Sequence, residues 1–163
     1  MQKVIFILLV LHFSMGYSQK NDFNFIVSVN DNLENVYAYR FVLKNKNGKK
    51  DVVNLNYIPG KISIEKSDYQ ALLSDSIIQI NLIVRSLKQC GNRVDTSEYK
   101  IENFKLAWLN KGSYFILYIY DTNNKKYNKI YEPLPNEHFT FEFDWSEGSM
   151  RRVQKKQLKG KCN

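Results

Sequence analysis

The sequence predicts an all-β protein: an antiparallel β-sandwich of about seven or eight short strands with one or two short helical turns. Three observations predict this fold. Several short segments alternate between apolar and polar residues with a period of two. Asn, Asp and Gly residues typical of tight turns separate these segments at short intervals. Little of the chain has helical spacing. A small β-barrel is the alternative architecture.

The first half of the chain contains four predicted strands, at residues 23–29, 36–44, 52–57 and 61–65. Residues 45–48, Asn-Lys-Asn-Gly, supply the positive-φ positions of a hairpin turn between the second and third strands. Pro59 and Gly60 end the third strand.

The alternation within 36–44 predicts which side chains share a face. Tyr37, Tyr39, Phe41 and Leu43 are expected together on one face of this strand. After the fourth strand, Ser67 has the spacing of a capping box, which predicts a short helix ending near residue 73.

The second half begins with the longest apolar segment, residues 77–87, which we expect to be a central strand. Residues 89–97 are expected to form a polar loop, and residues 99–104 a strand that runs into a helical turn. Three further strands complete the predicted fold, at 114–120, 126–131 and 139–145, the first two forming a hairpin.

The N-terminal residues 1–18 have the anatomy of a secretory signal peptide. Lys3 precedes an apolar run of about ten residues, which is too short for a membrane-spanning helix of about 20 residues. Small residues at 14, 16 and 18 allow cleavage before Gln19 or before Tyr17. No cysteine lies nearby for lipid attachment. We expect a protein that is exported, periplasmic or secreted, without a transmembrane segment after cleavage.

The positive charge is concentrated at the C-terminus. The chain has a net charge of +8, yet residues 150–163 hold six basic residues and no acid. The domain between them and the signal peptide is therefore close to neutral. The predicted organisation is a signal peptide at 1–18, a β-sandwich domain at 19–149 and a basic tail at 150–163.

Residue types that carry catalysis are sparse, and we expect no catalytic, cofactor-binding or metal site. His138 is the only histidine after residue 18, too few for a zinc site. Glu142 and Asp144 share one face of a strand whose opposite face, with Phe141 and Phe143, is expected to be the core. Two acids on a solvated face are what solubility alone predicts.

Two features suggest contact with a partner. Tyrosines on strand faces can stack on sugar rings or anchor a protein partner; they are Tyr37, Tyr39, Tyr114, Tyr118 and Tyr120. The tail could attach to polyanions; its proposed contacts are Arg151, Arg152, Lys155 and Lys156. Ordinary β-propensity and a solvated chain end are the alternative explanations. The tail lacks interleaved aromatic residues, so sequence-specific nucleic-acid binding is not expected.

These features predict a small, exported, non-enzymatic binding or interaction protein whose partner is a protein, a glycan or another polyanion. An inhibitor or immunity-type protein directed at a secreted enzyme is the first alternative. A hydrolase with an unrecognised site is the second.

Cys90 and Cys162 are the two cysteines of the chain, and an oxidising compartment predicts a disulfide between them. The bridge would close a loop of about 70 residues and remove roughly 4 kcal/mol of unfolded-chain entropy. The exported protein should therefore resist alkylation at both residues until a reductant is added, as intact-mass measurement can show. Alkylation without reductant would indicate free thiols, and a reducible dimer an intermolecular bridge.

Overall fold

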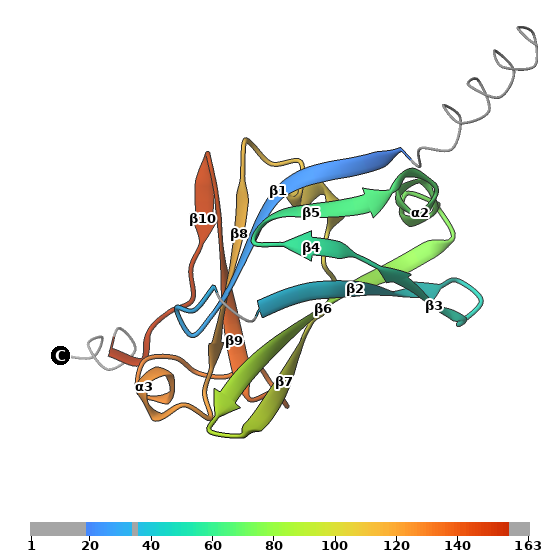
Figure 1. Cartoon of the computed structure of the whole chain (residues 1–163). Coiled ribbons are helices and arrows are strands. Elements are labelled where there is room, and N and C mark those ends of the chain that lie inside the picture. The colour runs from blue at the N-terminus through green and yellow to red at the C-terminus, as the bar shows by residue number, and fades with distance from the viewer. Residues whose placement is uncertain (1–18, 34–35, 157–163) are drawn as a thin grey trace, which may run out of the picture.

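The structure is a computed structural model that describes residues 19–33 and 36–156, with the backbone alone at residues 89 and 90. Two open β-sheets pack against each other in a sandwich-like arrangement, and nearly all neighbouring strands are antiparallel (Figure 1). The predicted all-β, antiparallel sandwich is confirmed. The described residues form ten strands, more than the predicted seven or eight.

Sheet A has six strands in the order β10-β9-β8-β1-β5-β4. Their bounds, in that order, are Gly148–Met150, Phe139–Trp145, Phe115–Asp121, Lys20–Val29, Gly60–Glu65 and Asn56–Ile58. β1 pairs in parallel with β8 and antiparallel with β5. The first described strand of the chain therefore lies inside the sheet, not at its edge.

Sheet B has four strands in the order β3-β2-β6-β7, all antiparallel. Their bounds, in that order, are Lys50–Asn54, Val36–Asn45, Ile77–Cys90 and Arg93–Ile101. β6 is an interior strand, as its long apolar run predicts.

The core lies between the sheets and is rich in aromatic rings. Phe25 of β1 stacks on Phe115 of β8, with ring centroids 5.7 Å apart. Phe104, which follows β7, meets both rings edge-on at 6.4 and 6.3 Å. Trp108, in the 3₁₀ turn Leu106–Trp108, packs 4.7 Å from Phe143 of β9. The chain between β7 and β8 thus contributes core as well as connection.

Two short helices lie at opposite ends of sheet A (Figure 1). α2 (Lys66–Leu72) packs on β5 and β1, and α3 (Lys125–Asn128) packs on β8. The capping box predicted at Ser67 is wrong: Glu65 is the N-cap residue and makes no side-chain capping bond. Lys66 N–H instead donates to the carbonyl of Gln19, which joins the helix start to β1.

A β-bulge in β2 corrects the predicted face of the tyrosines. The register with β6 skips from Ala38 to Arg40, so Tyr39 is an extra residue. Ala38 on one side of the bulge and Phe41 on the other are both fully buried, whereas Tyr37 is exposed. Tyr37 and Tyr39 therefore do not share a face with Phe41.

The polar loop predicted at 89–97 is also wrong, because β6 and β7 form one long hairpin. Cys90 pairs with Arg93 across a two-residue turn in which Gly91 has φ 61°. Glycine at the first central position is typical of type II′ hairpin turns. Pairing with β2 ends at Ser86, so the tip of the hairpin extends beyond the rest of sheet B.

Two other predicted strands differ from the structure. Residues 52–57 divide at Leu55, before which β3 belongs to sheet B and after which β4 belongs to sheet A. Residues 126–131 contain α3, and β8 pairs with β9 instead. The side chain of Asn124 accepts a hydrogen bond from Lys126 N–H, an N-cap that favours helix over strand at this position.

Tyr99 provides a test of the packing between the sheets. It is 1% exposed on β7, and its hydroxyl donates to Asp121 Oδ2 of sheet A at 3.0 Å. Tyr99→Phe should lower the free energy of unfolding by about 1.5–3 kcal/mol, the range for a hydrogen bond to a charged group. Tyr99→Ala should lower it by roughly 3–5 kcal/mol because it also leaves a cavity.

Urea denaturation of the two variants measures both effects. Equal losses in Tyr99→Phe and Tyr99→Ala would contradict a core role for the ring.

Candidate functional site

The five candidate tyrosines lie on two different sheets. Tyr37 and Tyr39 belong to β2 of sheet B, whereas Tyr118 and Tyr120 belong to β8 of sheet A and Tyr114 directly precedes β8. Since the outer faces of a sandwich point away from each other, the tyrosines form two separate surfaces.

On sheet A, Tyr120 is covered by the segment that follows β8. Its ring stacks on Tyr131 with centroids 4.4 Å apart and on Tyr127 at 5.4 Å. Burial raises the pKa of Tyr120 above its usual value, and the hydrogen bond with Tyr131 raises it further. Tyr120 therefore helps to attach this segment to the sheet, while Tyr114 remains 41% exposed.

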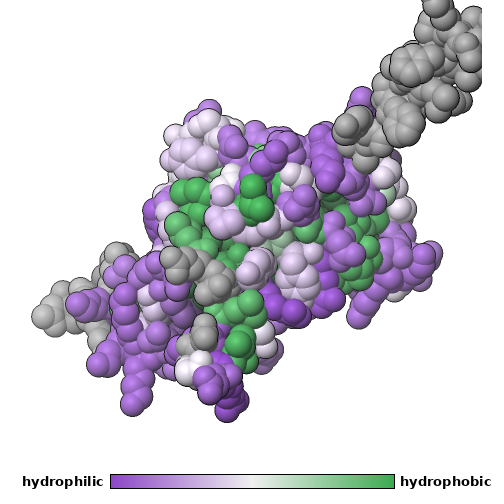
Figure 2. Space-filling view, in the orientation of Figure 1, coloured by the Kyte–Doolittle hydropathy of each residue, from purple (hydrophilic) through white to green (hydrophobic). Residues whose placement is uncertain are grey.

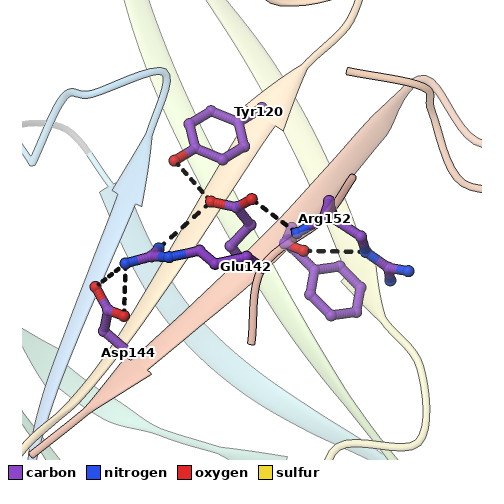
Figure 3. Close-up of polar contacts among 6 residues, drawn as sticks. Tyr120, Glu142, Asp144 and Arg152 are labelled. Atoms are coloured by element: carbon purple, nitrogen blue, oxygen red, sulfur yellow. Dashed lines mark hydrogen bonds and ion pairs between the residues drawn. The ribbon is translucent and has the colours of Figure 1, made fainter. Parts of the chain in front are cut away.

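The described part of the basic tail binds the same face. Both oxygens of Asp144 accept hydrogen bonds from Arg151 Nη2 at 2.7 Å (Figure 3). The same guanidinium lies 3.4 Å from Glu142 and 5.7 Å from the centroid of the Tyr118 ring. Asp144 raises the pKa of Arg151 through these hydrogen bonds.

Glu142 is buried, and its predicted place on a solvated face is wrong. It is 4% exposed. One carboxylate oxygen accepts the backbone N–H of Arg152 at 2.8 Å, and the other lies 3.4 Å from the Tyr120 hydroxyl (Figure 3). The alternation of 139–145 correctly predicts that Phe143 is in the core. Glu142 lies on the other face of β9, but the chain beyond β10 crosses that face and covers it.

Lys155 continues this attachment. Its backbone N–H donates to the carbonyl of Ile130 at 2.8 Å, and its ammonium group donates to the carbonyl of Asn128 at 2.6 Å. Glu132 lies 3.6 Å from the same ammonium group. Arg151, Arg152 and Lys155 are thus engaged by the domain, and Lys156 is exposed.

On the outer face of sheet B, four side chains from three strands form what we name the Tyr39 cluster: Tyr39, Arg40, Arg85 and Glu98. The Tyr39 hydroxyl donates to Glu98. The guanidinium groups of Arg40 and Arg85 lie 5.0 and 4.8 Å from the centroid of the Tyr39 ring and 3.5 and 3.6 Å from Glu98. Burial raises the pKa of Tyr39, and the hydrogen bond to Glu98 adds to the effect.

One donor of the Tyr39 cluster has no partner among the described residues. The Nε atom of Arg40 is buried and makes no hydrogen bond there. A buried donor of this kind costs about 1–3 kcal/mol when it stays without a partner. Beside it, Tyr37 is 42% exposed and lies opposite Arg85 in the β2–β6 register.

Other chemistry-bearing side chains are dispersed. The described residues contain no group of three or more His, Cys, Asp or Glu that could hold a metal ion. His138 packs 5.7 Å from Tyr99 and 5.8 Å from Phe139. Asp121 accepts the backbone N–H of Asn123 within a turn.

Two cavities lie beside α2 and are open to solvent. They measure about 560 and 630 Å³ and share Ser74 and Ile77; the first is lined largely by aliphatic residues, whereas most residues lining the second are polar or charged. In Figure 2, apolar side chains gather in two separate strips on this view of the molecule, one of them near α2. Two acids, Asp51 and Asp68, line the second cavity. Asp51 pairs with Lys49 at 2.9 Å and accepts a hydrogen bond from Asn45 at 2.7 Å.

Two expectations fall wholly or partly outside the description. The side chain of Cys90 and the whole of Cys162 lie outside the described residues, so the disulfide stays a prediction, as does the signal peptide. Among the described residues, no helix has the length and apolar character needed to cross a membrane.

The sequence pointed to the tyrosines but missed Arg40, Arg85 and Glu98. These residues are distant along the chain and meet only through the β2–β6–β7 register. In β6, Arg85 follows the buried Val84 and therefore points to the other face of the sheet. This alternation is the one sequence signal that predicts an outward position for Arg85.

Comparisons of the chain with protein-family models, with curated proteins and with solved structures find no match.

The buried position of Glu142 predicts a measurable effect. Glu142→Gln keeps an acceptor for Arg152 N–H but removes the charge that Arg151 faces. It should lower the free energy of unfolding by about 1.5–3 kcal/mol, the range for hydrogen bonds to charged groups. Trypsin should then cleave after Arg151 and Arg152 several-fold faster. Glu147→Gln, an exposed acid two residues beyond β9, is the control. Equal cleavage rates in the two variants would show that Glu142 does not hold the segment.

Proposed function

We propose that the protein is a small, exported, non-enzymatic binding module whose ligand surface is the outer face of sheet B. The observation that carries the proposal is the exposed Tyr37 ring beside the Tyr39 cluster. Signal-peptide features at residues 1–18 support export. The scattered positions of the titratable side chains favour binding over catalysis.

The chemistry of this face suits a ligand with both flat and polar surfaces. Tyrosine supplies a large contact area at low cost in side-chain entropy. Arg40 and Arg85 are held over Tyr39 by Glu98, so their donors are positioned before a ligand arrives. Pre-positioned donors lose less entropy on binding, which favours affinity.

Sheet B is a better ligand surface than sheet A for a specific reason. The tail covers part of β9, and Tyr131 covers Tyr120. Both helices pack on sheet A strands. On sheet B, Tyr37 and the exposed residues around it remain open. The attached arginines of the tail are better explained as an anchor than as a polyanion site.

The long β6–β7 hairpin favours a second candidate, an inhibitor of a secreted enzyme. Val94, near its tip, is 61% exposed, and a protruding ribbon can enter an active-site cleft. A purified secreted hydrolase whose inhibition is lost in Val94→Asp but kept in Tyr37→Ser would favour this candidate.

Tyr37→Ser tests the proposed surface. On an array of neutral and acidic glycans, the variant should bind about tenfold more weakly than the wild type, because truncating a central aromatic contact costs ~1–2 kcal/mol. Circular dichroism should show an unchanged fold, since the side chain is exposed.

Tyr114→Ser is the matched control, because Tyr114 is 41% exposed against 42% for Tyr37 but lies by sheet A. A loss of binding in Tyr114→Ser alone would move the ligand surface to sheet A. Unchanged binding in both variants, or no glycan bound by the wild type, would count against the proposed function.

A further inference from the structure

We propose that the ligand of sheet B is an acidic polysaccharide. Its carboxylate or sulfate groups bind a pair of lysines on the same face as Tyr37, at the far end of strand β2. This inference rests on the proposed function and names the class of its ligand. The two lysines are Lys44 of β2 and Lys50 of β3.

Lys44 and Lys50 place like charges at directly paired positions of two neighbouring strands. They are paired residues in the β2–β3 register, and both are exposed. Like charges directly opposite each other destabilise a strand pair. Within the described residues neither lysine has an acidic partner, whereas their neighbour Lys49 pairs with Asp51 at 2.9 Å. An anion bound between Lys44 and Lys50 would remove the repulsion.

A small hollow accompanies the lysine pair. A cavity of about 260 Å³ is lined by Lys44, Lys50 and Lys100, by one acid, Glu102, and by neighbouring residues of β2 and β6. Lys100 is held by Glu102 at 2.5 Å, so the positive charge that remains belongs to the first two lysines. The volume lies just below the ~300 Å³ at which small-molecule pockets begin. It therefore fits one charged group of a longer ligand.

The spacing along β2 indicates that the ligand is a polymer. Tyr37 and Lys44 are six register steps apart, because Tyr39 is the extra residue of the bulge. At roughly 3.3 Å per step, the strand rises by about 20 Å between them. Arg40 lies between these two positions on the same face, opposite Ile83 of β6. A chain lying along β2 would thus meet an aromatic ring, a guanidinium group and then two ammonium groups.

The aromatic content favours a glycan over single-stranded nucleic acid. Proteins hold single strands by stacking successive bases on several aromatic rings. Here the two arginines lie over Tyr39, which leaves Tyr37 as the exposed ring of the face. One stacked sugar and several charge contacts match this arrangement.

The test uses the full mature protein and immobilised probes of defined chemistry: polygalacturonic acid for carboxylates, heparin for sulfates and neutral dextran. Oligo(dT) and polyglutamate represent nucleic acid and acidic protein. The double variant Lys44→Gln/Lys50→Gln should lose about tenfold in affinity for at least one acidic probe, because it removes both charge contacts with the anion. The dependence of wild-type affinity on salt should also become shallower in the variant.

Lys125→Gln/Lys129→Gln is the matched control. It removes the same charge from exposed positions in and beside α3, on the sheet A side. Its affinity for the acidic probes should stay close to that of the wild type. An equal loss in both double variants would overturn the inference, because the attraction would then follow net charge and not the Lys44–Lys50 pair.

The outcomes also separate this inference from the proposed function. Binding to neutral glycans that depends on Tyr37, with none to the acidic probes, overturns the acidic ligand and keeps the binding surface. Stronger binding of oligo(dT) or polyglutamate than of both acidic glycans replaces the ligand class with nucleic acid or acidic protein. A loss of acidic-probe binding in Lys44→Gln/Lys50→Gln and in Tyr37→Ser supports both.

Discussion

The bulge at Tyr39 is the constraint on which the two faces of sheet B depend. In a strand of strict period two, Ala38 and Phe41 would point to opposite sides of the sheet. The extra residue restores them to the same side, where both are fully buried. A regular strand would expose the ring of Phe41 or bury Tyr37 in the core. The bulge therefore maintains the core and places Tyr37 outside in one step.

The same irregularity explains why the sequence predicted the strand but not its faces. The sequence from Val36 to Leu43 can be assigned to two alternating faces of a regular strand without any bulge. A bulge leaves no compositional mark, since it depends on how β2 pairs with β6, more than 40 residues away. The all-β class and the interior position of β6 could be predicted from the local pattern. The pairing of the strands, and the contacts that depend on this pairing, could not be predicted from local pattern.

Glu142 shows a second limit of local pattern. Alternation correctly places it opposite Phe141 and Phe143, yet both sides of β9 are buried. An outward residue is solvated only when nothing crosses it, and the residues that cross β9 follow it in sequence. The charges of Arg151 and Asp144 gave no sign of their pairing, because a basic tail and an amphipathic strand are each explained by solubility. Part of the tail's charge, on Arg151 and Lys155, instead attaches the tail to the domain.

The interior position of β1 sets the order in which this domain can form. β1 pairs with β5 within about 40 residues of chain, but its parallel partner β8 lies about 90 residues away. Such distant pairing slows folding, because a long loop must close before the contact stabilises it. Until residues 115–121 arrive, one edge of β1 stays open beside the apolar side chains of Phe25 and Val27. The chain is therefore most exposed to aggregation before β8 pairs with β1, rather than after the fold is complete.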